Sequence, residues 1–524
     1  MEKRKYAKSG QLKALLQLLV FLYTFGWLQI DNSLIVLAEE RQRVITRERE
    51  VVKKHWQLAQ WKDGDLVCNL FLDHEQLPNS GEVLDKCGYD VYVSWLTTPD
   101  CQQAVGGGNV SQCKGLFLSF AGTAKVMVEE QVELPQPSVQ VEIDNCTPGE
   151  ICDERPKLNF IGDEPVLAYE IIEVHVRIEA SEKKCEEQSC LLRMPITDVN
   201  GVWVEYWAVS DYGDESEHEF ILLRNMEVED SDFYRMDILG DDWAEYAPSG
   251  AIIWYLFPSL DHPLTRLLEQ PFISGYLSTT NRYVYLAGHL ITYGYADASD
   301  CLGGGLLENG AANTCGEIAA AEEVLLWQNQ YDDTIYQAAQ KYNIPAYVLK
   351  GIIAQETQFW PHSESKEELG LGKITENGAD LLLMWNIEYY LNICVPLFGE
   401  ITCAGGYDNL YPGEQEMLRG VALSKVGTEQ EIDLLAATLL ASVSQTNQLL
   451  ENVTGKSPRE VTTYENMWVI TIGNYHSGAG CIGTAMQTAW DSNQSMEWET
   501  VIGYLLGGCQ SASNYVERVR ELSQ

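Results

Sequence analysis

The 524-residue sequence has few basic residues. It contains 35 lysines and arginines against 77 aspartates and glutamates, which gives a formal net charge of −42. The phosphate backbone of a nucleic acid would repel such a chain, and an anionic lipid surface would do the same. The composition therefore argues strongly against a nucleic-acid partner and is typical of a protein that stays soluble outside a cell.

The sequence also lacks the usual marks of a metal site. No two of its 14 cysteines are separated by two residues, and none of its 8 histidines stands at zinc spacing beside a cysteine. The acidic residues 211–219 could bind calcium, but they show no 12-residue loop spacing, so a solvated turn is the simpler interpretation. We expect no metal and no cofactor.

Long apolar runs are equally scarce, and only residues 12–30 approach the length of a membrane span. Residues 3–5 (Lys-Arg-Lys) precede this run, and residues 36–38 (Val-Leu-Ala) offer small side chains for cleavage before Glu39. Residues 1–38 therefore predict an export signal, with a retained membrane anchor as the alternative. The expected location is secreted or at the cell surface.

The cysteines are even in number, which together with an export signal predicts disulfides. They fall as neighbours along the sequence, so we expect local pairing, although spacing alone does not determine connectivity. The expected pairs are Cys68 and Cys87, Cys101 and Cys113, Cys146 and Cys152, Cys185 and Cys190, Cys301 and Cys315, Cys394 and Cys403, and Cys481 and Cys509.

Residues 61–227 have the pattern of β-structure. Residues 90–95 and 139–143 alternate between apolar and polar side chains, as strands do, and clusters of glycine, asparagine and proline separate such segments. The charged residues 39–60 before them predict a short helix or stalk. We expect a cysteine-containing β module over residues 39–150.

A second β module is expected over residues 151–227. Residues 169–178 have a strand pattern, and residues 195–214 contain a turn at Gly201, a strand with Tyr-Trp-Ala, and an Asp-Tyr-Gly-Asp turn. This order resembles the Ig-like repeats of bacterial surface proteins and secreted glycosidases. The resemblance implies a β-sandwich and, by itself, no activity.

Residues 228–316 are interpreted as an aromatic-rich connecting region that ends in a glycine-rich linker around residues 303–310. Core packing is the preferred role of the aromatic side chains, and an aromatic-lined sugar platform is the alternative. The aromatic residues concerned are Trp243, Tyr246, Trp254, Tyr255 and Phe257.

From residue 317 to 524 the pattern becomes helical. Residues 317–328 carry alanine and leucine at helical spacing, and Asp332 opens a helix that ends near Asn343. Residues 428–431 (Thr-Glu-Gln-Glu) read as a capping box for a long helix that ends before Gly455.

One helix of this half carries a carboxylate on its apolar side. Leu349, Ile352 and Ile353 lie within about 60° of Glu356 on a helical wheel. Desolvation and the negative end of the helix dipole both favour the neutral form of a carboxyl group there. Such conditions suit a general acid that must hold its proton near neutral pH.

Three motifs follow in order: residues 355–361 (Gln-Glu-Thr-Gln-Phe-Trp-Pro), residues 370–375 (Gly-Leu-Gly-Lys-Ile-Thr) and residues 474–480 (Asn-Tyr-His-Ser-Gly-Ala-Gly). They resemble the soluble lytic transglycosylase domain, whose pattern is Glu-Ser-x-Phe, Gly-Leu-Met-Gln and Ala-Tyr-Asn-Ala-Gly. The resemblance implies a lysozyme-like helical fold. The expected chain is thus multidomain, with a disulfide-rich, all-β N-terminal half (including an Ig-like sandwich) before a mainly α, lysozyme-like domain at residues 317–524.

The resemblance also implies an activity, cleavage of the β-1,4 bond between N-acetylmuramic acid and N-acetylglucosamine in peptidoglycan. Glu356 would protonate the glycosidic oxygen, and the sugar's own 6-hydroxyl would then close a 1,6-anhydro ring. One carboxyl group serves as acid and then as base, unlike the pair used by most glycosidases. No second carboxylate stands on a matching motif, although Glu376 and Asp380 are near in sequence.

The resemblance assigns substrate-binding roles to seven further residues: Thr357, Gly370, Leu371, Lys373, Asn474, Tyr475 and His476. Some positions depart from the family pattern, since Gly372 and Lys373 replace methionine and glutamine. Lys373 would lower the pKa of Glu356 if it pointed at that carboxylate, and could hold a muramyl peptide carboxylate if it pointed outward. The alternative function is a non-catalytic, glycan-binding surface or adhesion protein with a degenerate lysozyme-like domain.

Overall fold

The computed structural model describes residues 43–98, 114–228, 231–260, 263–362 and 368–523. The predicted signal or anchor at residues 1–38 and the predicted pair Cys101 and Cys113 lie outside them. The chain divides into two compact units. The first holds the chain up to Ser138 with Glu164–Ile171 and Val209–Ser216, and the second holds the remainder.

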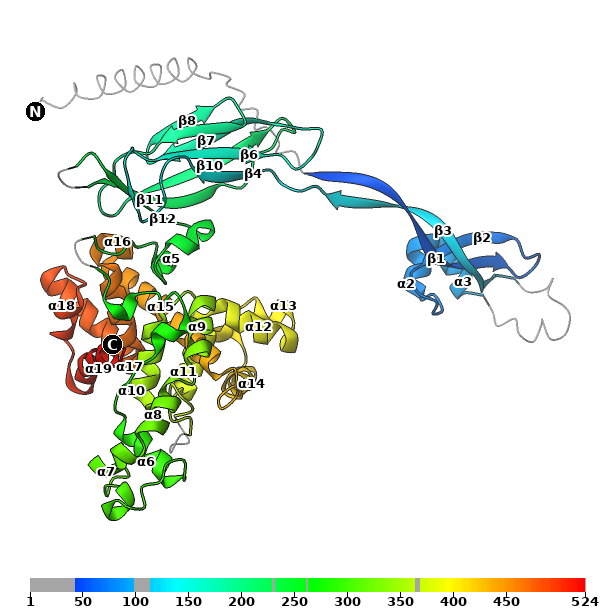
Figure 1. Ribbon diagram of the computed structural model, residues 1–524. Helices are drawn as coiled ribbons and strands as arrows, with labels where there is room; N and C mark the ends of the chain where they lie inside the picture. The colour runs from blue at the N-terminus through cyan, green and yellow to red at the C-terminus, as the bar shows by residue number, and fades with distance from the viewer. Residues whose placement is uncertain (1–42, 99–113, 229–230, 261–262, 363–367, 524) are drawn as a thin grey trace, which may run out of the picture. The chain divides into compact units, whose positions relative to one another are not determined.

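A long antiparallel ribbon dominates the first unit (Figure 1). Strand β1 (Val44–Gln60) lies between β2 (Leu66–Leu72) and β3 (Leu116–Glu133). The prediction of a helix or stalk at residues 39–60 is wrong for its described part. Alternating charges suit a helix locally, but β3 supplies cross-strand partners such as Glu130, which pairs with Arg47 at 3.0 Å.

Two short helices, α2 (Ser80–Cys87) and α3 (Tyr89–Leu96), follow β2. The strand predicted at residues 90–95 is therefore wrong, because six alternating residues cannot outweigh a helical start and a tertiary core. Asn79 and Glu82 cap the start of α2 reciprocally. The Asn79 side chain accepts the backbone N–H of Glu82 at 3.0 Å, and the Glu82 side chain accepts that of Asn79 at 2.8 Å. Side chains one helical turn apart on α3 then pack on a small core with Trp56 and Leu58.

A buried ion cluster secures the start of the ribbon within the first unit. The Arg43 guanidinium donates to Glu164 at 2.5 and 2.8 Å and to Asp214 at 2.5 and 3.1 Å. It also donates to the carbonyl of Pro135 at 2.6 Å. The hydrogen bond from Arg43 lowers the pKa of Glu164 to about 2, against the opposing effect of burial.

Two antiparallel sheets follow in the chain, and the strands predicted at residues 139–143 and 169–178 are present in them as β4 and β7. The six-stranded sheet has the order β5 (Ile151–Cys152), β12 (Tyr234–Leu239), β11 (Glu219–Glu227), β10 (Val202–Ser210), β7 (Ile171–Ile178), β8 (Ser181–Cys185), and the three-stranded sheet has the order β4 (Ser138–Ile143), β6 (Lys157–Asp163), β9 (Ser189–Arg193). The rings of Phe160 on β6 and Tyr206 on β10 lie 5.2 Å apart, which brings one strand of each sheet into contact.

The C-terminal region is helical, as predicted for residues 317–524, and helices also occur earlier, within the residues 228–316 that were interpreted as a connecting region. Its α-helices are α5 (Ala251–Trp254), α6 (Val284–Thr292), α7 (Thr314–Ala319), α8 (Ala321–Asn329), α9 (Asp332–Lys341), α10 (Ala346–Thr357), α11 (Glu376–Trp385), α12 (Ile387–Phe398), α13 (Glu400–Cys403), α14 (Pro412–Leu423), α15 (Glu431–Thr454), α16 (Pro458–Val461), α17 (Tyr464–Asn493), α18 (Trp498–Ile502) and α19 (Ser511–Leu522). Short 3-10 helices occur at Asp241–Tyr246, Arg266–Leu268, Ser274–Leu277, Leu302–Gly305, Tyr407–Asn409 and Gly507–Gln510.

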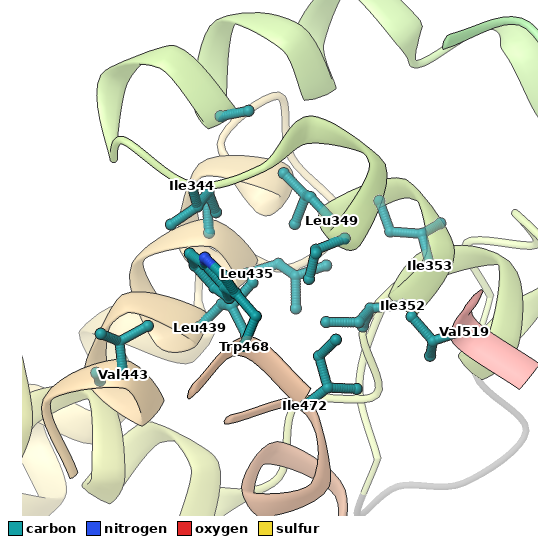
Figure 2. Packing of buried hydrophobic residues seen from close by; sticks show 14 of the residues in the cluster. Ile344, Leu349, Ile352, Ile353, Leu435, Leu439, Val443, Trp468, Ile472 and Val519 are labelled. Carbon is teal, nitrogen blue, oxygen red and sulfur yellow. The ribbon is translucent and has the colours of Figure 1, made fainter. Parts of the chain in front are cut away.

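The helices pack around one apolar core. Figure 2 shows the cluster where apolar side chains of α10, α15 and α17 meet, including Leu349, Leu435 and Trp468. The connecting region joins the same core, because Trp254 is buried and its ring lies 5.0 Å from that of Trp468. Core packing, the preferred role of these aromatics, is therefore confirmed for Trp254 and also for the buried Phe257.

Six of the predicted local disulfides are present, and they indicate an extracytoplasmic location. They join Cys68 to Cys87, Cys146 to Cys152, Cys185 to Cys190, Cys301 to Cys315, Cys394 to Cys403 and Cys481 to Cys509. Within the described ranges, no single helix has the length and apolar character for a membrane span, although α11 and α12, bent by 96° at their junction, meet that test as a pair.

Replacing Arg43 by glutamine should destabilise the segment Val209–Ser216, whose Asp214 binds the guanidinium. Two buried carboxylates would lose their cation, which costs about 3–5 kcal/mol at neutral pH. Amide exchange of Val209–Ser216, corrected for intrinsic rates, should show this loss. The difference from wild type should shrink as the pH falls from about 4.5 towards 2, because the stabilisation from a depressed Glu164 pKa is lost in that window.

The matched control for this experiment is Arg47→Gln. The Arg47 side chain is 56% exposed and pairs with Glu130, so its loss should change exchange by no more than about 0.5 kcal/mol. Equal protection of Val209–Ser216 in Arg43→Gln and wild type at pH 7 would show that the buried cluster does not hold this segment.

Candidate active site

The carboxylate predicted as the acid lies in the last turn of α10. The helix begins after Pro345 and ends at Thr357, and its cap residue Gln358 adopts a left-handed conformation with φ 49°. Phe359 follows with φ 65° and is fully buried. Two successive left-handed residues without glycine cost of order 1–3 kcal/mol each, so their surroundings must hold them. The turn ends the helix directly after Glu356 and Thr357.

Helix α19 supplies a tyrosine to this carboxylate. The helices approach closely at Gly351, where an added Cβ would lie 2.8 Å from the Val519 carbonyl oxygen. One turn earlier on α19, Tyr515 donates a hydrogen bond of 2.6 Å to Oε1 of Glu356. Sequence reasoning missed Tyr515 because it stands in none of the three motifs. Its only signal was the apolar periodicity that it shares with Val516 and Val519 on α19.

The second motif forms a tight hairpin beside the acid. Leu369 and Ile374 exchange two backbone hydrogen bonds of 2.8 and 3.0 Å. The Thr357 hydroxyl donates to the carbonyl of Leu371 at 3.0 Å, and the Tyr475 hydroxyl donates to the carbonyl of Gly372 at 2.7 Å. The three motifs, which span residues 355–480, therefore meet at the backbone of this hairpin.

Glu431 holds the hairpin from behind, and the capping box predicted at residues 428–431 is wrong. The helix begins at Glu431 itself, and its cap residue Gln430 makes no side-chain cap. The buried Glu431 carboxylate instead accepts the backbone N–H of Leu371 and, at 2.9 Å, that of Gly427. Gly370, with φ 71°, is required because a Cβ there would collide with this carboxylate.

Glu356 opens into a pocket of about 750 Å³. That volume is within the range usual for small-molecule sites. Of the predicted site residues, Glu356, Thr357, Gly370 and Lys373 line it together. Three further lining residues, Gln355, Gln358 and Trp360, belong to the first motif but had no predicted role in the site. The lining residues that sequence reasoning missed are Tyr285, His289, Thr292, Tyr293, Asn309, Gly310, His362, Glu368 and Arg518.

Burial raises the pKa of the Glu356 carboxyl group above its ordinary value. The hydrogen bond from Tyr515 and the charge of Lys373 oppose this shift, and the charge of Glu368 adds to it. Burial and the Glu356 charge also raise the pKa of Tyr475 and of Tyr515, so both hydroxyls stay protonated at neutral pH. The site thus combines a weakened acid with two neutral hydroxyl donors.

Lys373 belongs to an ion pair with another carboxylate. Its Nζ lies 3.7 Å from Oε2 of Glu368, so the Lys373 charge interacts with Glu368 as well as with Glu356. The carboxylates that are near in sequence are held elsewhere: Asp380 accepts from Arg419 at 2.8 and 3.0 Å, and Glu376 lies 3.8 Å from the same arginine. Neither Asp380 nor Glu376 lines the pocket.

The other predicted residues support the site without lining the pocket. Leu371, a residue of the hairpin, is buried. Asn474 is buried between α17 and α15, where it donates to Gln445 at 3.0 Å. The ring of His476 stacks on that of Tyr515 at 4.2 Å, which braces the tyrosine.

No model of a known protein family matches the chain, and no curated protein matches its sequence. Within the described part of the chain, no group of three or more histidine, cysteine, aspartate or glutamate residues has the arrangement of a metal site. The case for a function therefore depends on the geometry around Glu356.

The raised pKa of Glu356 has a measurable effect on stability. The folded state holds this proton more tightly than the unfolded state, so wild type should lose stability relative to Glu356→Gln as the pH rises from about 4.3 through the raised pKa. Tyr515→Phe should enlarge that loss and Lys373→Met should enlarge it less, since both remove influences that lower the pKa. Urea unfolding across pH, with each variant made with and without Glu356→Gln, measures the effect.

The exposed control Lys456→Met should leave this pH dependence unchanged. A stability difference between wild type and Glu356→Gln that stays flat from pH 4 to 8 would show that the pKa of Glu356 is not raised.

Replacing Glu431 by glutamine should loosen the hairpin. The amide offers one acceptor where the carboxylate offers two, and it turns an N–H donor towards a backbone donor, which costs about 1–3 kcal/mol. We expect faster amide exchange at Leu371 and Gly427. The exposed neighbour Glu429→Gln is the control. Unchanged protection of Leu371 would rule out this role for Glu431.

Proposed function

We propose that the C-terminal helical region is a peptidoglycan lytic transglycosylase that cleaves the β-1,4 bond between N-acetylmuramic acid and N-acetylglucosamine. The observation that carries the proposal is the meeting of the three motifs at one hairpin beside the pocket that Glu356 lines. Glu356 lines that pocket, and Thr357 and Tyr475 hold the neighbouring hairpin by hydrogen bonds of 3.0 and 2.7 Å. The fold proposed for this region is lysozyme-like.

The chemistry proposed for Glu356 follows from its hydrogen bonds. Tyr515 donates to Oε1, so the proton of the neutral acid resides on Oε2. That proton passes to the glycosidic oxygen as the bond to the anomeric carbon breaks. The carboxylate left behind is stabilised by the same Tyr515 bond. It then takes the proton of the 6-hydroxyl as that oxygen attacks the anomeric carbon and closes the 1,6-anhydro ring.

The β-rich regions fit a role in placing the enzyme at the cell wall. The sheets formed by residues 138–239 support the proposal of an Ig-like module, and the disulfides support an extracytoplasmic site of action. These regions would hold the helical part near glycan strands and take no part in the chemistry.

Digestion of purified peptidoglycan tests the activity. Wild type should release muropeptides that end in 1,6-anhydro-N-acetylmuramic acid, which are one water lighter in mass than hydrolysis products. Glu356→Gln should lower the initial rate at least a hundredfold, because the amide cannot donate the proton that the leaving group needs. The matched control, Glu322→Gln on the exposed face of α8, should keep the wild-type rate.

The other outcomes point to other functions. Products of unreduced mass would indicate hydrolysis. Glycan binding by wild type without release of any product would favour the non-catalytic glycan-binding protein. Equal product from wild type and Glu356→Gln would exclude Glu356 as the acid.

A further inference from the structure

Helix α6 forms one wall of the acid pocket, although it precedes the segment that carries the three motifs. Gln358, two residues after Glu356, accepts the backbone N–H groups of Tyr285 and Leu286 at 3.0 and 3.2 Å. These are orphan donors at the start of a helix, and the amide oxygen caps them. These hydrogen bonds attach the left-handed turn after Glu356 to α6. They therefore fix the position of α6 relative to Glu356.

The face of α6 turned to the pocket is aromatic. Tyr285, His289 and Tyr293 are spaced four residues apart, which places them in a row along one side of the helix, and all three line the pocket. Tyr285 and Tyr293 are 49% and 64% exposed. Aromatic rings that line a pocket and stay exposed to solvent form an apolar patch of the kind that marks a ligand-binding site.

A buried tryptophan stiffens this wall. The Trp360 side chain is 4% exposed, and its ring stacks on His289 at 4.9 Å with an interplanar angle of 6°. Tyr293 lies 5.1 Å from the same ring, and Trp327 stacks on it at 5.2 Å. The rings that face the pocket therefore rest on a packed aromatic layer, which lowers the entropy lost on binding.

The chemistry of the wall differs from that of the rest of the pocket. The formally charged lining residues are Glu356, Glu368, Lys373 and Arg518, and none of them comes from α6 or from the loop at Asn309 and Gly310. Helix α6 and the loop at Asn309 and Gly310 instead present aromatic rings together with hydroxyl and amide groups to the pocket. A pyranose ring has the complementary surface, since it presents an apolar C–H face and a rim of hydroxyl groups.

We propose that α6 forms a sugar-binding subsite, in which a pyranose ring of the glycan strand stacks on Tyr293 and Tyr285 beside Glu356. The proposal rests on the proposed function for the identity of the strand. Its own claim is the subsite, which would extend the substrate contact beyond the two sugars that flank the cleaved bond.

Binding to the full-length Glu356→Gln protein tests the subsite without catalysis. The probes are N-acetylglucosamine oligomers of three to six units, and isothermal titration calorimetry measures their binding. Adding Tyr293→Ala should weaken binding of the longest oligomer about tenfold, the range expected for loss of one aromatic contact. Tyr285→Ala should weaken it less, because its ring is less exposed, and Tyr293→Phe should retain binding because the ring remains.

The control is Tyr276→Ala, since Tyr276 is 59% exposed and does not line the pocket. Circular dichroism verifies the folding of each variant, and Tyr293→Leu replaces Tyr293→Ala if the latter unfolds. Equal affinity of the Glu356→Gln protein with and without the tyrosine substitutions, or no binding of any oligomer, would overturn the subsite.

The two proposals fail separately. Tyrosine-dependent binding without peptidoglycan cleavage by wild type would keep the subsite and remove the enzyme. Cleavage with an unchanged rate and unchanged affinity in Tyr293→Ala and Tyr285→Ala would keep the enzyme and remove the subsite.

Discussion

The contact between α10 and α19 determines the state of Glu356. Gly351 lets the two helices approach so closely that Tyr515 reaches the carboxylate, which is also desolvated by burial. Two opposing effects then act on one group. Desolvation favours the neutral acid, while the Tyr515 hydrogen bond favours the anion, and the net pKa is raised because desolvation is larger. A carboxyl group in this balance can release a proton and still be stabilised afterwards.

The hairpin at residues 369–374 depends on a different buried carboxylate. Glu431 accepts the backbone N–H of Leu371 from inside the core, and the side chains of Leu371 and Ile374 add apolar packing. Tyr475 and Thr357 then bond to its carbonyl groups from the other motifs. Since a buried N–H without an acceptor costs about 1–3 kcal/mol, these bonds contribute to fixing the position of the hairpin.

Helical periodicity and cysteine spacing predicted some local features well. Helical periodicity placed Glu356 on the apolar side of α10, and cysteine neighbours anticipated six disulfides, because both depend on residues close in the chain. Features that depend on distant partners were not predictable. The β1 strand exists because β3 lies beside it, and α3 packs on a core that β1 and β2 supply. Tyr515 is 159 residues from Glu356, and no motif connects them.

The positions that depart from the pattern of the proposed lytic transglycosylase family are accommodated by their neighbours. A Cβ at Gly372 would collide with the Leu435 side chain, so glycine suits the packing of this hairpin against α15. Lys373 has a φ of 47° and forms an ion pair with Glu368. This ion pair weakens the electrostatic effect of the Lys373 charge on Glu356. If these departures marked decay of the site, we would expect the acid to have lost its burial or its hydrogen-bond donor. Glu356 retains both, so the altered loop is compatible with a carboxyl group that still holds its proton.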